Sequence, residues 1–362
     1  MIIAISITLF FLILRFTVTI FNFISNPKLT RVNRQYNDLV SILIPARNEE
    51  DKILSLLESI DQQDYQNYEV IIYDDGSSDG TYAVCSAYAT DHKRFKVIKG
   101  DKLPDGWSGK NYACDQLAKQ ANAKYFLFLD ADVCLADSLI NSAIHRMHLY
   151  KLGLLSLFPN QDMLTVGERI TVPLIHYLLL NLLPLRLVYL IKNGVVATAS
   201  GQCMFFDGDV YRQNRWHKQI KNKMSGDAEV MKLVKTKLFN GEVLLANGMI
   251  RSRKYDSYSH AVTCLSKNLM AAFNFNTPAL LIYILLMVGG PMVVLMTLNF
   301  NLIFFMAGLI ILSRIMTSLS SGENAGYNVI LHPLQMINLV IIAFLSIQKY
   351  LTKTVVWKGR KI

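Results

Sequence analysis

Three short stretches of this 362-residue sequence place carboxylates directly after apolar, β-prone runs. They are residues 44–50 (IPARNEE), 73–80 (YDDGSSDG) and 128–133 (FLDADV). In parallel α/β sheets ligands sit at the carboxyl ends of the strands, so we expect the three stretches to line one crevice. A hard divalent cation held there by one or two carboxylates would neutralise a nucleotide diphosphate and assist its departure as a leaving group.

The third stretch contains an Asp-x-Asp pair. Asp130 and Asp132 are two positions apart at a predicted strand end, and side chains with that spacing point to the same face. One carboxylate can then hold the metal while the other holds a ribose or a water molecule. Each stretch alone also fits an ordinary turn or a helix cap, but all three in this order favour a nucleotide site.

Alternating strand-like and helix-like stretches between residues 36 and 160 would position these carboxylates. The helical spacing of Ile53, Leu56 and Ile60 marks the first helix. Repetition of strand and helix predicts an α/β fold with a parallel sheet that is covered on both faces. The predicted strands are residues 39–44, 70–73, 95–98, 125–129 and 154–158.

Apolar runs at both ends of the sequence predict membrane segments. Residues 1–24 are long enough to cross a bilayer, and Arg15 can reach an interface by snorkelling. The alternative, a signal peptide, lacks a basic start and a small-residue cleavage site here. Residues 277–348 contain three apolar blocks, and the basic tail 349–362 favours a cytoplasmic end. Three spans would leave this tail outside, so one block is a candidate for a re-entrant segment.

Two further segments, near residues 170–192 and 251–272, mix apolar with basic residues. That mixture is expected of helices lying in the headgroup plane. A true span at the first segment would put the two halves of the globular domain on opposite sides of the membrane. We therefore predict an interfacial helix pair there.

The net charge of +10 and the mean hydropathy of +0.28 fit one globular domain with membrane segments. The cations lie next to apolar runs, which favours an anionic membrane surface as partner and argues against nucleic acid. The five cysteines show no CxxC spacing and are expected to be reduced thiols. They indicate a globular domain in the cytoplasm.

The carboxylate stretches together resemble those of family 2 glycosyltransferases with the GT-A fold, over roughly residues 38–270. The resemblance implies that the first stretch cradles the nucleobase and that Asp75 contacts base or ribose. It also implies that Asp130 and Asp132 bind the donor and Mn²⁺ or Mg²⁺. The donor-binding residues that it suggests are Pro45, Ala46, Arg47, Glu49, Asp75, Lys110 and Asp130, and the metal ligands are Asp132 and Asp130.

Residues 103–111 (LPDGWSGKN) resemble a loop of the carotenoid-type and hopene-associated members of this family. The loop leads into a predicted helix over residues 111–121, with Lys110 at its start. Helix N-termini favour anions, and a lysine there can meet a donor phosphate. The alternative is a surface lysine on an ordinary helix.

The acceptor side is suggested by two later stretches. Residues 201–206 (GQCMFF) resemble the family's acceptor-side strand and make Gln202 a candidate contact. Within residues 224–229 (MSGDAE), Asp227 matches the family's catalytic base, which takes the proton of the attacking hydroxyl. Gly226 stands where an acidic residue is usual, and Glu229 is a weaker candidate base. Asp227 also suits a helix N-cap.

Arg253 and Lys267 resemble a late acceptor-side region of the family, although Leu265 stands where tryptophan is expected. The Gln-x-x-Arg-Trp motif of processive synthases is absent, which argues against a long-chain polymer synthase. Residues 355–360 (VVWKGR) resemble the end of the carotenoid branch.

The resemblance implies an inverting glycosyltransferase that moves a sugar from a nucleotide sugar, expected to be UDP-glucose, to a lipid-like acceptor such as a carotenoid or other terpenoid. The alternatives are a polysaccharide or polyprenyl-phosphate sugar synthase of the same family and a non-catalytic membrane scaffold. The expected plan is a multi-pass cell-membrane protein. It has an anchor at 1–24, a cytoplasmic GT-A domain at 36–275, transmembrane helices at 277–348 and a basic tail at 349–362.

Overall fold

The computed structural model describes residues 1–223, 226–352, 356–357 and 360–361, and these divide into two compact units. The sheet unit consists of Pro27–Asn160 and Leu185–Lys254. The helical unit consists of Met1–Asn26, Gln161–Pro184 and Tyr255–Lys361. Parts of the expected 36–275 domain therefore group with the apolar helices.

A seven-stranded mixed sheet forms the centre of the sheet unit, in the order β3-β2-β1-β4-β8-β6-β9. Strand β1 pairs in parallel with β2 and β4, and β2 pairs in parallel with β3. The elements of this unit are β1 (Val40–Ala46), α2 (Glu50–Asp61), β2 (Tyr68–Asp74), α3 (Thr81–Asp91), β3 (Phe95–Lys99), α4 (Gly109–Gln120), β4 (Tyr125–Leu129), β5 (Val133–Leu135), α5 (Leu139–Tyr150), β6 (Leu152–Phe158), α8 (Leu185–Leu190), β8 (Cys203–Asp207), α9 (Gly208–Asn214), α10 (Trp216–Gln219), α11 (Gly226–Thr236), β9 (Asn240–Leu245) and β10 (Ile250–Ser252), while β7 (Asn160–Gln161) lies at its border.

The predicted α/β sheet is confirmed, and the five strands predicted between residues 36 and 160 all run in the same direction, but the sheet as a whole is mixed. Strand β8 runs antiparallel between β4 and β6. Strand β6 ends at the carboxyl edge of the sheet, and the chain returns to the same edge before β8. Strand β8 begins there with Cys203, which lies opposite Leu129, the last residue of β4. A strand that starts at this edge must run back through the sheet.

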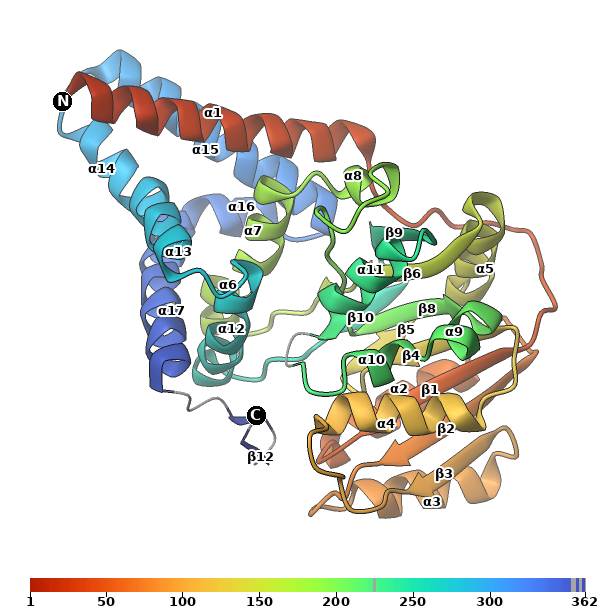
Figure 1. The fold of residues 1–362 in the computed structure, drawn as a ribbon. Coiled ribbons are helices and arrows are strands. Elements are labelled where there is room, and N and C mark those ends of the chain that lie inside the picture. Colours follow the sequence, from red (N-terminus) through yellow and green to blue (C-terminus); the bar gives the residue numbers. More distant parts are fainter. Residues whose placement is uncertain (224–225, 353–355, 358–359, 362) are drawn as a thin grey trace. The chain divides into compact units, whose positions relative to one another are not determined.

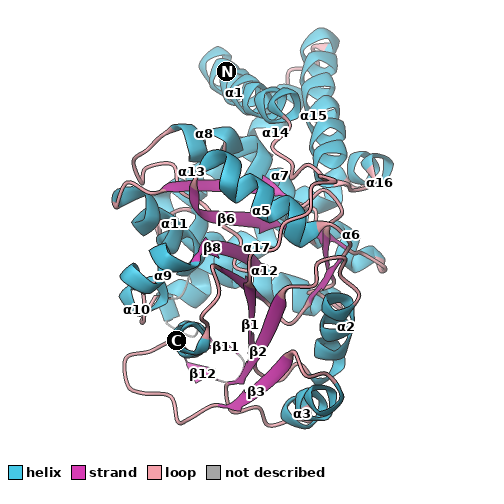
Figure 2. Cartoon of the chain, turned by 90° about the vertical axis from the view of Figure 1, so that its right-hand side faces the viewer, coloured by secondary structure: helices cyan, strands magenta, loops and turns pink. Residues whose placement is uncertain are grey.

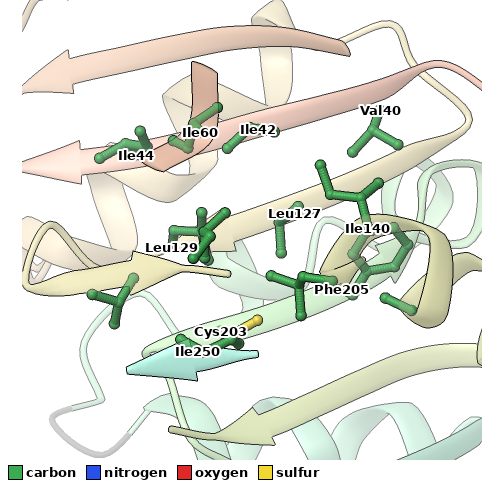
Figure 3. Packing of buried hydrophobic residues seen from close by; sticks show 14 of the residues in the cluster. Val40, Ile42, Ile44, Ile60, Leu127, Leu129, Ile140, Cys203, Phe205 and Ile250 are labelled. Carbon is green, nitrogen blue, oxygen red and sulfur yellow. The ribbon is translucent and has the colours of Figure 1, made fainter. Parts of the chain in front are cut away.

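Buried side chains from several strands fill one face of the sheet (Figure 3). Val40, Ile42 and Ile44 alternate along β1 on this face, as side chains two apart do in a strand. Ile60 of α2 and Ile140 of α5 pack against the same cluster. Almost every residue of β1 is buried, which fits a strand covered on both faces.

The parallel pairing brings the predicted carboxylate stretches to one edge of the sheet. Strands β1, β2 and β3 lie side by side (Figure 2). Strand β1 ends at Ala46, β2 at Asp74 and β4 at Leu129, so each stretch continues from a carboxyl end. The arrangement that the sequence predicted for these strand ends is therefore present.

The helical unit contains four segments that are long and apolar enough to cross a membrane: Ile2–Ser25, Thr277–Leu295, Phe300–Ser321 and His332–Thr352. They coincide with the predicted anchor and the three apolar blocks. Helices α1 and α15 of this unit lie side by side (Figure 1). Its elements are α1 (Ile2–Ser25), α6 (Val166–Thr171), α7 (Leu174–Leu182), α12 (Tyr258–Ala272), α13 (Thr277–Ile284), the π-helix η1 (Leu285–Gly289), α14 (Gly290–Leu295), α15 (Phe300–Ser321), α16 (Ala325–Ile330), α17 (His332–Thr352), β11 (Val356–Trp357) and β12 (Arg360–Lys361).

The expectation that Arg15 snorkels to an interface was wrong. Its side chain is buried within the helical unit, where Nη2 donates to Asn181 Oδ1 at 3.2 Å. The guanidinium also lies 5.1 Å from the centre of the Tyr177 ring. A charged residue in an apolar helix is stabilised by such partners in the bundle interior, so it has no need to reach water.

The helix pair predicted for residues 170–192 is present as α7 and α8. The 170–192 region contains α7 and α8, the end of α6, and two proline interruptions. Pro173 is the N-cap of α7, and Pro184 precedes α8, because proline cannot continue a preceding helix. The 251–272 region consists of the end of β10 followed by α12. In the predicted basic tail, residues 353–355, 358–359 and 362 lie outside the described part of the chain.

We expect Glu242→Gln to lower the free energy of unfolding of the sheet unit by about 3 kcal/mol or more, because breaking a buried ion pair leaves an uncompensated charge. Glu242 on β9 is 1% exposed, and its carboxylate oxygens lie 2.6 Å and 2.5 Å from Nε and Nη2 of Arg146. Asp209→Asn is the matched control, since Asp209 is 77% exposed in its pair with Arg212. Thermal unfolding in detergent measures both variants, and equal small losses would contradict the prediction.

Candidate active site

The Asp-x-Asp pair lies just past the end of β4, and all its carboxylate oxygens face polar partners. Oδ1 of Asp130 lies 2.6 Å from Lys110 Nζ, and Oδ1 of Asp132 accepts from Gln202 Nε2 at 3.1 Å. The Oδ2 atoms of both carboxylates face one ammonium group, that of Lys254, at 3.7 Å and 3.5 Å. Two carboxylates thus converge on a single cationic position.

Gln202, just before β8, and Ser252 of β10 hold Asp132 in place. The Gln202 side chain donates to Asp132 and also to Ser252 Oγ, at 2.8 Å. Ser252 Oγ donates in turn to the backbone carbonyl of Asp132 at 3.3 Å. Burial alone raises the pKa of Asp132, but the Lys254 ammonium and the Gln202 hydrogen bond outweigh it and hold that pKa below its usual value. Asp132 is therefore ionised near neutral pH.

Lys110 connects the Asp-x-Asp pair to the predicted base. Helix α4 begins at Gly109 after the N-cap Ser108, so Lys110 lies in its first turn. Its Nζ contacts Asp130 and donates to the carbonyl of Gly201 at 3.2 Å. Burial favours the neutral amine, but the Asp130 and Asp227 carboxylates outweigh burial and raise the pKa of Lys110. This lysine is a fixed positive charge between two acids.

Asp227 lies in the first turn of α11 and packs directly against the backbone of Gly201. A Cβ atom at Gly201 would come within 2.2–2.3 Å of the Asp227 carboxylate, so only glycine allows this approach. Asp227 is inside the helix, which begins at Gly226, so the N-cap alternative was wrong. A carboxylate in the first turn is still favoured by the helix dipole.

The glycine at position 226 also has a steric reason. A Cβ there would lie 2.7 Å from Ile220 Cδ1 and 3.1 Å from Asn111 Oδ1. Asn111 of α4 anchors this region by donating to the carbonyls of Ile220 and Lys223 at 2.8 Å and 3.1 Å. An acidic residue here would require the side chains of Ile220 and Asn111 to shift. Of the stretch 224–229, residues 224 and 225 lie outside the described residues.

A second set of predicted residues forms a paired-loop cradle beyond β1 and β2. The Asp75 N–H donates to the Ala46 carbonyl at 2.8 Å, and Arg47 Nη1 donates to the carbonyls of Asp75 and Gly76. Asn48 accepts from the N–H of Ser78 at 2.8 Å. These contacts join the loop after β1 to the loop after β2.

The remaining residues of this cradle support the same junction. Pro45 pairs in register with Tyr73, and the Glu49 N–H donates to Thr81 Oγ1 at 2.8 Å. Asp74 and Asp75 are both buried, each 2% exposed, and Asp74 Oδ2 accepts from the Ser77 N–H at 3.3 Å. The structure therefore gathers all the sequence-predicted residues of the first two stretches at one strand edge.

Arg253 and Lys267 are the two late residues predicted for the acceptor side. Arg253 is exposed, whereas its neighbour Lys254 faces the Asp-x-Asp pair. Lys267 lies on α12, which belongs to the helical unit, whereas the carboxylates belong to the sheet unit. Sequence reasoning missed Lys254 and Ser252 as site residues. Ser252 is the last residue of the short strand β10, whose residues are buried at alternate positions, and Lys254 follows two positions later.

The residues present fit a divalent cation of the Mn²⁺ or Mg²⁺ type. Carboxylates are the hard oxygen ligands that such ions prefer, and the Lys254 ammonium stands where a cation faces both carboxylates. Within the described ranges, no group of three or more His, Cys, Asp or Glu side chains could hold a metal. Two carboxylates suffice where substrate phosphates complete the coordination.

The comparison with known families decides what kind of domain this is. The family model described as "Glycosyl transferase family 2" matches residues 41–213. The chain carries a family 2 glycosyl transferase domain. The match includes the paired-loop cradle, Lys110, the Asp-x-Asp pair and Gln202.

Similar sequences point to the same family. The chain is 38% identical over 123 residues to a 4,4'-diaponeurosporenoate glycosyltransferase of Staphylococcus aureus strain MRSA252. It is 37% identical over 143 residues to the enzyme of that name from the bovine strain RF122. These matches cover 33% and 39% of this chain and only 31% and 36% of the relatives' own length.

A solved structure shares the fold. A mannosyltransferase of Pyrobaculum calidifontis, in complex with GDP-Man and Mn²⁺, matches with a TM-score of 0.56. The match covers 96% of this chain and 99% of the other at 13% sequence identity. At this identity the likeness shows a GT-A-like glycosyl transferase fold, in agreement with the predicted fold class.

We expect Gly201→Ala to reduce the rate of sugar transfer at least tenfold, because the added methyl group occupies the space of the Asp227 carboxylate. Such a loss corresponds to about 1.4 kcal/mol of transition-state stabilisation. Initial rates at saturating donor measure the effect. Gly308→Ala is the control, since a Cβ there meets nothing within 4 Å. Unchanged transfer by Gly201→Ala would show that the position of Asp227 does not matter.

Proposed function

We propose that this protein is an inverting, metal-assisted glycosyltransferase that uses a nucleotide-sugar donor. One arrangement carries the proposal: Lys110 contacts Asp130 and the Gly201 carbonyl, and the Asp227 carboxylate packs against the same Gly201, at the carboxyl edge of the sheet. A non-catalytic scaffold would have no need of a separate carboxylate packed tightly against Gly201.

Backbone groups of the paired-loop cradle and charged side chains would bind the donor. The paired-loop cradle offers polar groups for base and ribose, with Arg47 holding the two loops together. Lys110 places an ammonium group at the start of α4, where the helix dipole also favours a phosphate. Asp130 and Asp132 would hold Mn²⁺ or Mg²⁺, which supplies positive charge to the departing diphosphate.

The acceptor side is assigned to Asp227. An acceptor hydroxyl must lose its proton as its oxygen attacks the anomeric carbon, and Asp227 is the carboxylate placed to accept that proton. The new C–O bond forms on the face opposite the departing diphosphate, so the configuration inverts. Lys110 keeps the charge of Asp227 balanced before the proton arrives.

A lipid-like acceptor is supported by the apolar helices and by the names of the similar proteins. Four segments of the helical unit are suited to a membrane, more than anchoring needs. The similar Staphylococcus aureus proteins are named for a carotenoid acid acceptor. We assign UDP-glucose as donor and a carotenoid or other terpenoid as acceptor, at the cytoplasmic membrane face.

We expect Asp132→Ala to weaken metal-dependent donor binding by at least about tenfold, while Asp227→Asn leaves binding nearly intact and stops transfer. The reason is that metal ligation and proton acceptance are separate steps. Calorimetry with UDP-glucose and Mn²⁺ measures binding, and radiolabelled sugar measures transfer. Full wild-type activity in excess chelator would refute the metal role, and retained turnover by Asp227→Asn would redirect the base assignment to Glu229.

The side of the membrane is tested with Cys134. Cys85 and Cys114, both in the sheet unit, are buried and unsuitable as reporters, whereas Cys134 on β5 is exposed. In a Cys264→Ser background, an impermeant maleimide should label inverted membrane vesicles and spare intact cells. Labelling of intact cells would place the sheet unit outside.

The acceptor is identified by mass spectrometry of lipid extracts from cells with and without the gene. A terpenoid species heavier by one hexose should appear only when the gene is present, and Asp227→Asn is the matched control. A hexose-bearing polyprenyl phosphate or a longer glycan in place of that species would contradict the terpenoid assignment and favour a synthase of the same family.

A further inference from the structure

The ammonium of Lys254 occupies the point on which the Asp-x-Asp pair converges. The other two carboxylate oxygens are already engaged, by Lys110 and by Gln202. The two Oδ2 atoms both face Lys254 Nζ, at 3.7 Å and 3.5 Å. The lysine therefore places a positive charge beside the two carboxylates that would hold a divalent cation.

The backbone at Lys254 is fixed, whereas its side chain has room to move. Lys52 Nζ donates to the Lys254 carbonyl at 3.1 Å, and Ser252, two positions earlier, accepts a hydrogen bond from Gln202. The Lys254 side chain is 32% exposed, so its flexible stem can carry the charge away without burying it. Its contacts with the aspartates are ion pairs at the longer end of the usual range, which makes them the easiest to exchange.

We propose that Lys254 is a built-in counter-ion that a divalent cation displaces, and that the freed ammonium then pairs with the diphosphate of the donor. This inference rests on the proposed function and adds a coupling to it. A metal ion that binds alone must expel the ammonium, which then faces solvent. A metal ion that arrives with a nucleoside diphosphate provides the ammonium with new negative partners.

The consequence is positive cooperativity between metal and donor. Two cations cannot share the same two oxygens without strong repulsion, so the lysine weakens the binding of free metal. The diphosphate removes that penalty, and linkage requires that each ligand tighten the other by the same factor. A resting enzyme would thus keep its Asp-x-Asp pair neutralised and take up metal together with donor.

The test measures Mn²⁺ alone, by electron paramagnetic resonance of free Mn²⁺, on the full chain in detergent. Lys254→Met keeps the apolar stem and removes the charge, and we expect it to bind Mn²⁺ about tenfold more tightly than the wild type. The factor by which UDP tightens Mn²⁺ should fall by a similar amount. Arg251→Met is the control, because it removes one positive charge from an exposed position on β10. Lys254→Arg should restore weak binding of Mn²⁺ alone.

Equal Mn²⁺ affinity in wild type and Lys254→Met, both folded by thermal unfolding, would overturn the counter-ion role and leave the proposed function standing. Weaker Mn²⁺ binding by Lys254→Met would overturn it as well, since the lysine would then only position the aspartates. If UDP-dependent Mn²⁺ binding were absent from every variant, both the inference and the metal-assisted function would fail.

Discussion

The charge balance around the Asp-x-Asp pair is the constraint on which the rest of the site depends. Two carboxylates side by side repel each other unless cations or hydrogen bonds compensate them. Here Lys110, Gln202 and Lys254 come from three separate parts of the chain to do so. Each of these residues also contacts other parts of the sheet unit. The compensation of the two carboxylate charges therefore holds α4, the start of β8 and the end of β10 together.

The sheet topology makes this balance possible. Parallel strands β1, β2 and β4 deliver the paired-loop cradle and the aspartates to one edge. The antiparallel strand β8 begins at that same edge, which places Gly201 and Gln202 beside Asp130. One reversed strand thus brings Gly201 and Gln202 to the edge that carries the aspartates.

Local pattern was enough to predict the strand ends and the residues that follow them. The runs before Ala46, Asp74 and Leu129 are apolar over the length of a strand, and the carboxylates come directly afterward in sequence. The role suggested for Asp227 came from resemblance, and the structure adds its approach to Gly201. That approach depends on two segments far apart in the chain.

Two other features could not be predicted from the sequence, because they also depend on contacts between distant segments. Lys254 stands next to the residue that was chosen, Arg253, and both follow the end of β10, where no periodic pattern tells which side chain is exposed and which lies at the site. Arg15 was predicted to reach an interface because the sequence does not show its partners. Asn181 and Tyr177 lie more than a hundred positions away in the chain. The spacing of apolar residues predicts which face of a helix or strand is buried. It does not predict which side chain from a distant part of the chain contacts that face.

The most direct test of the account is an anomalous difference map at the manganese absorption edge, from crystals of the full chain grown with Mn²⁺ and UDP. The account predicts one manganese peak within coordination distance of the Asp132 carboxylate, about 2.0–2.3 Å, with Asp227 still packed against Gly201. A peak remote from Asp132, or bound UDP with no manganese beside it, would contradict a metal-assisted transfer at this centre.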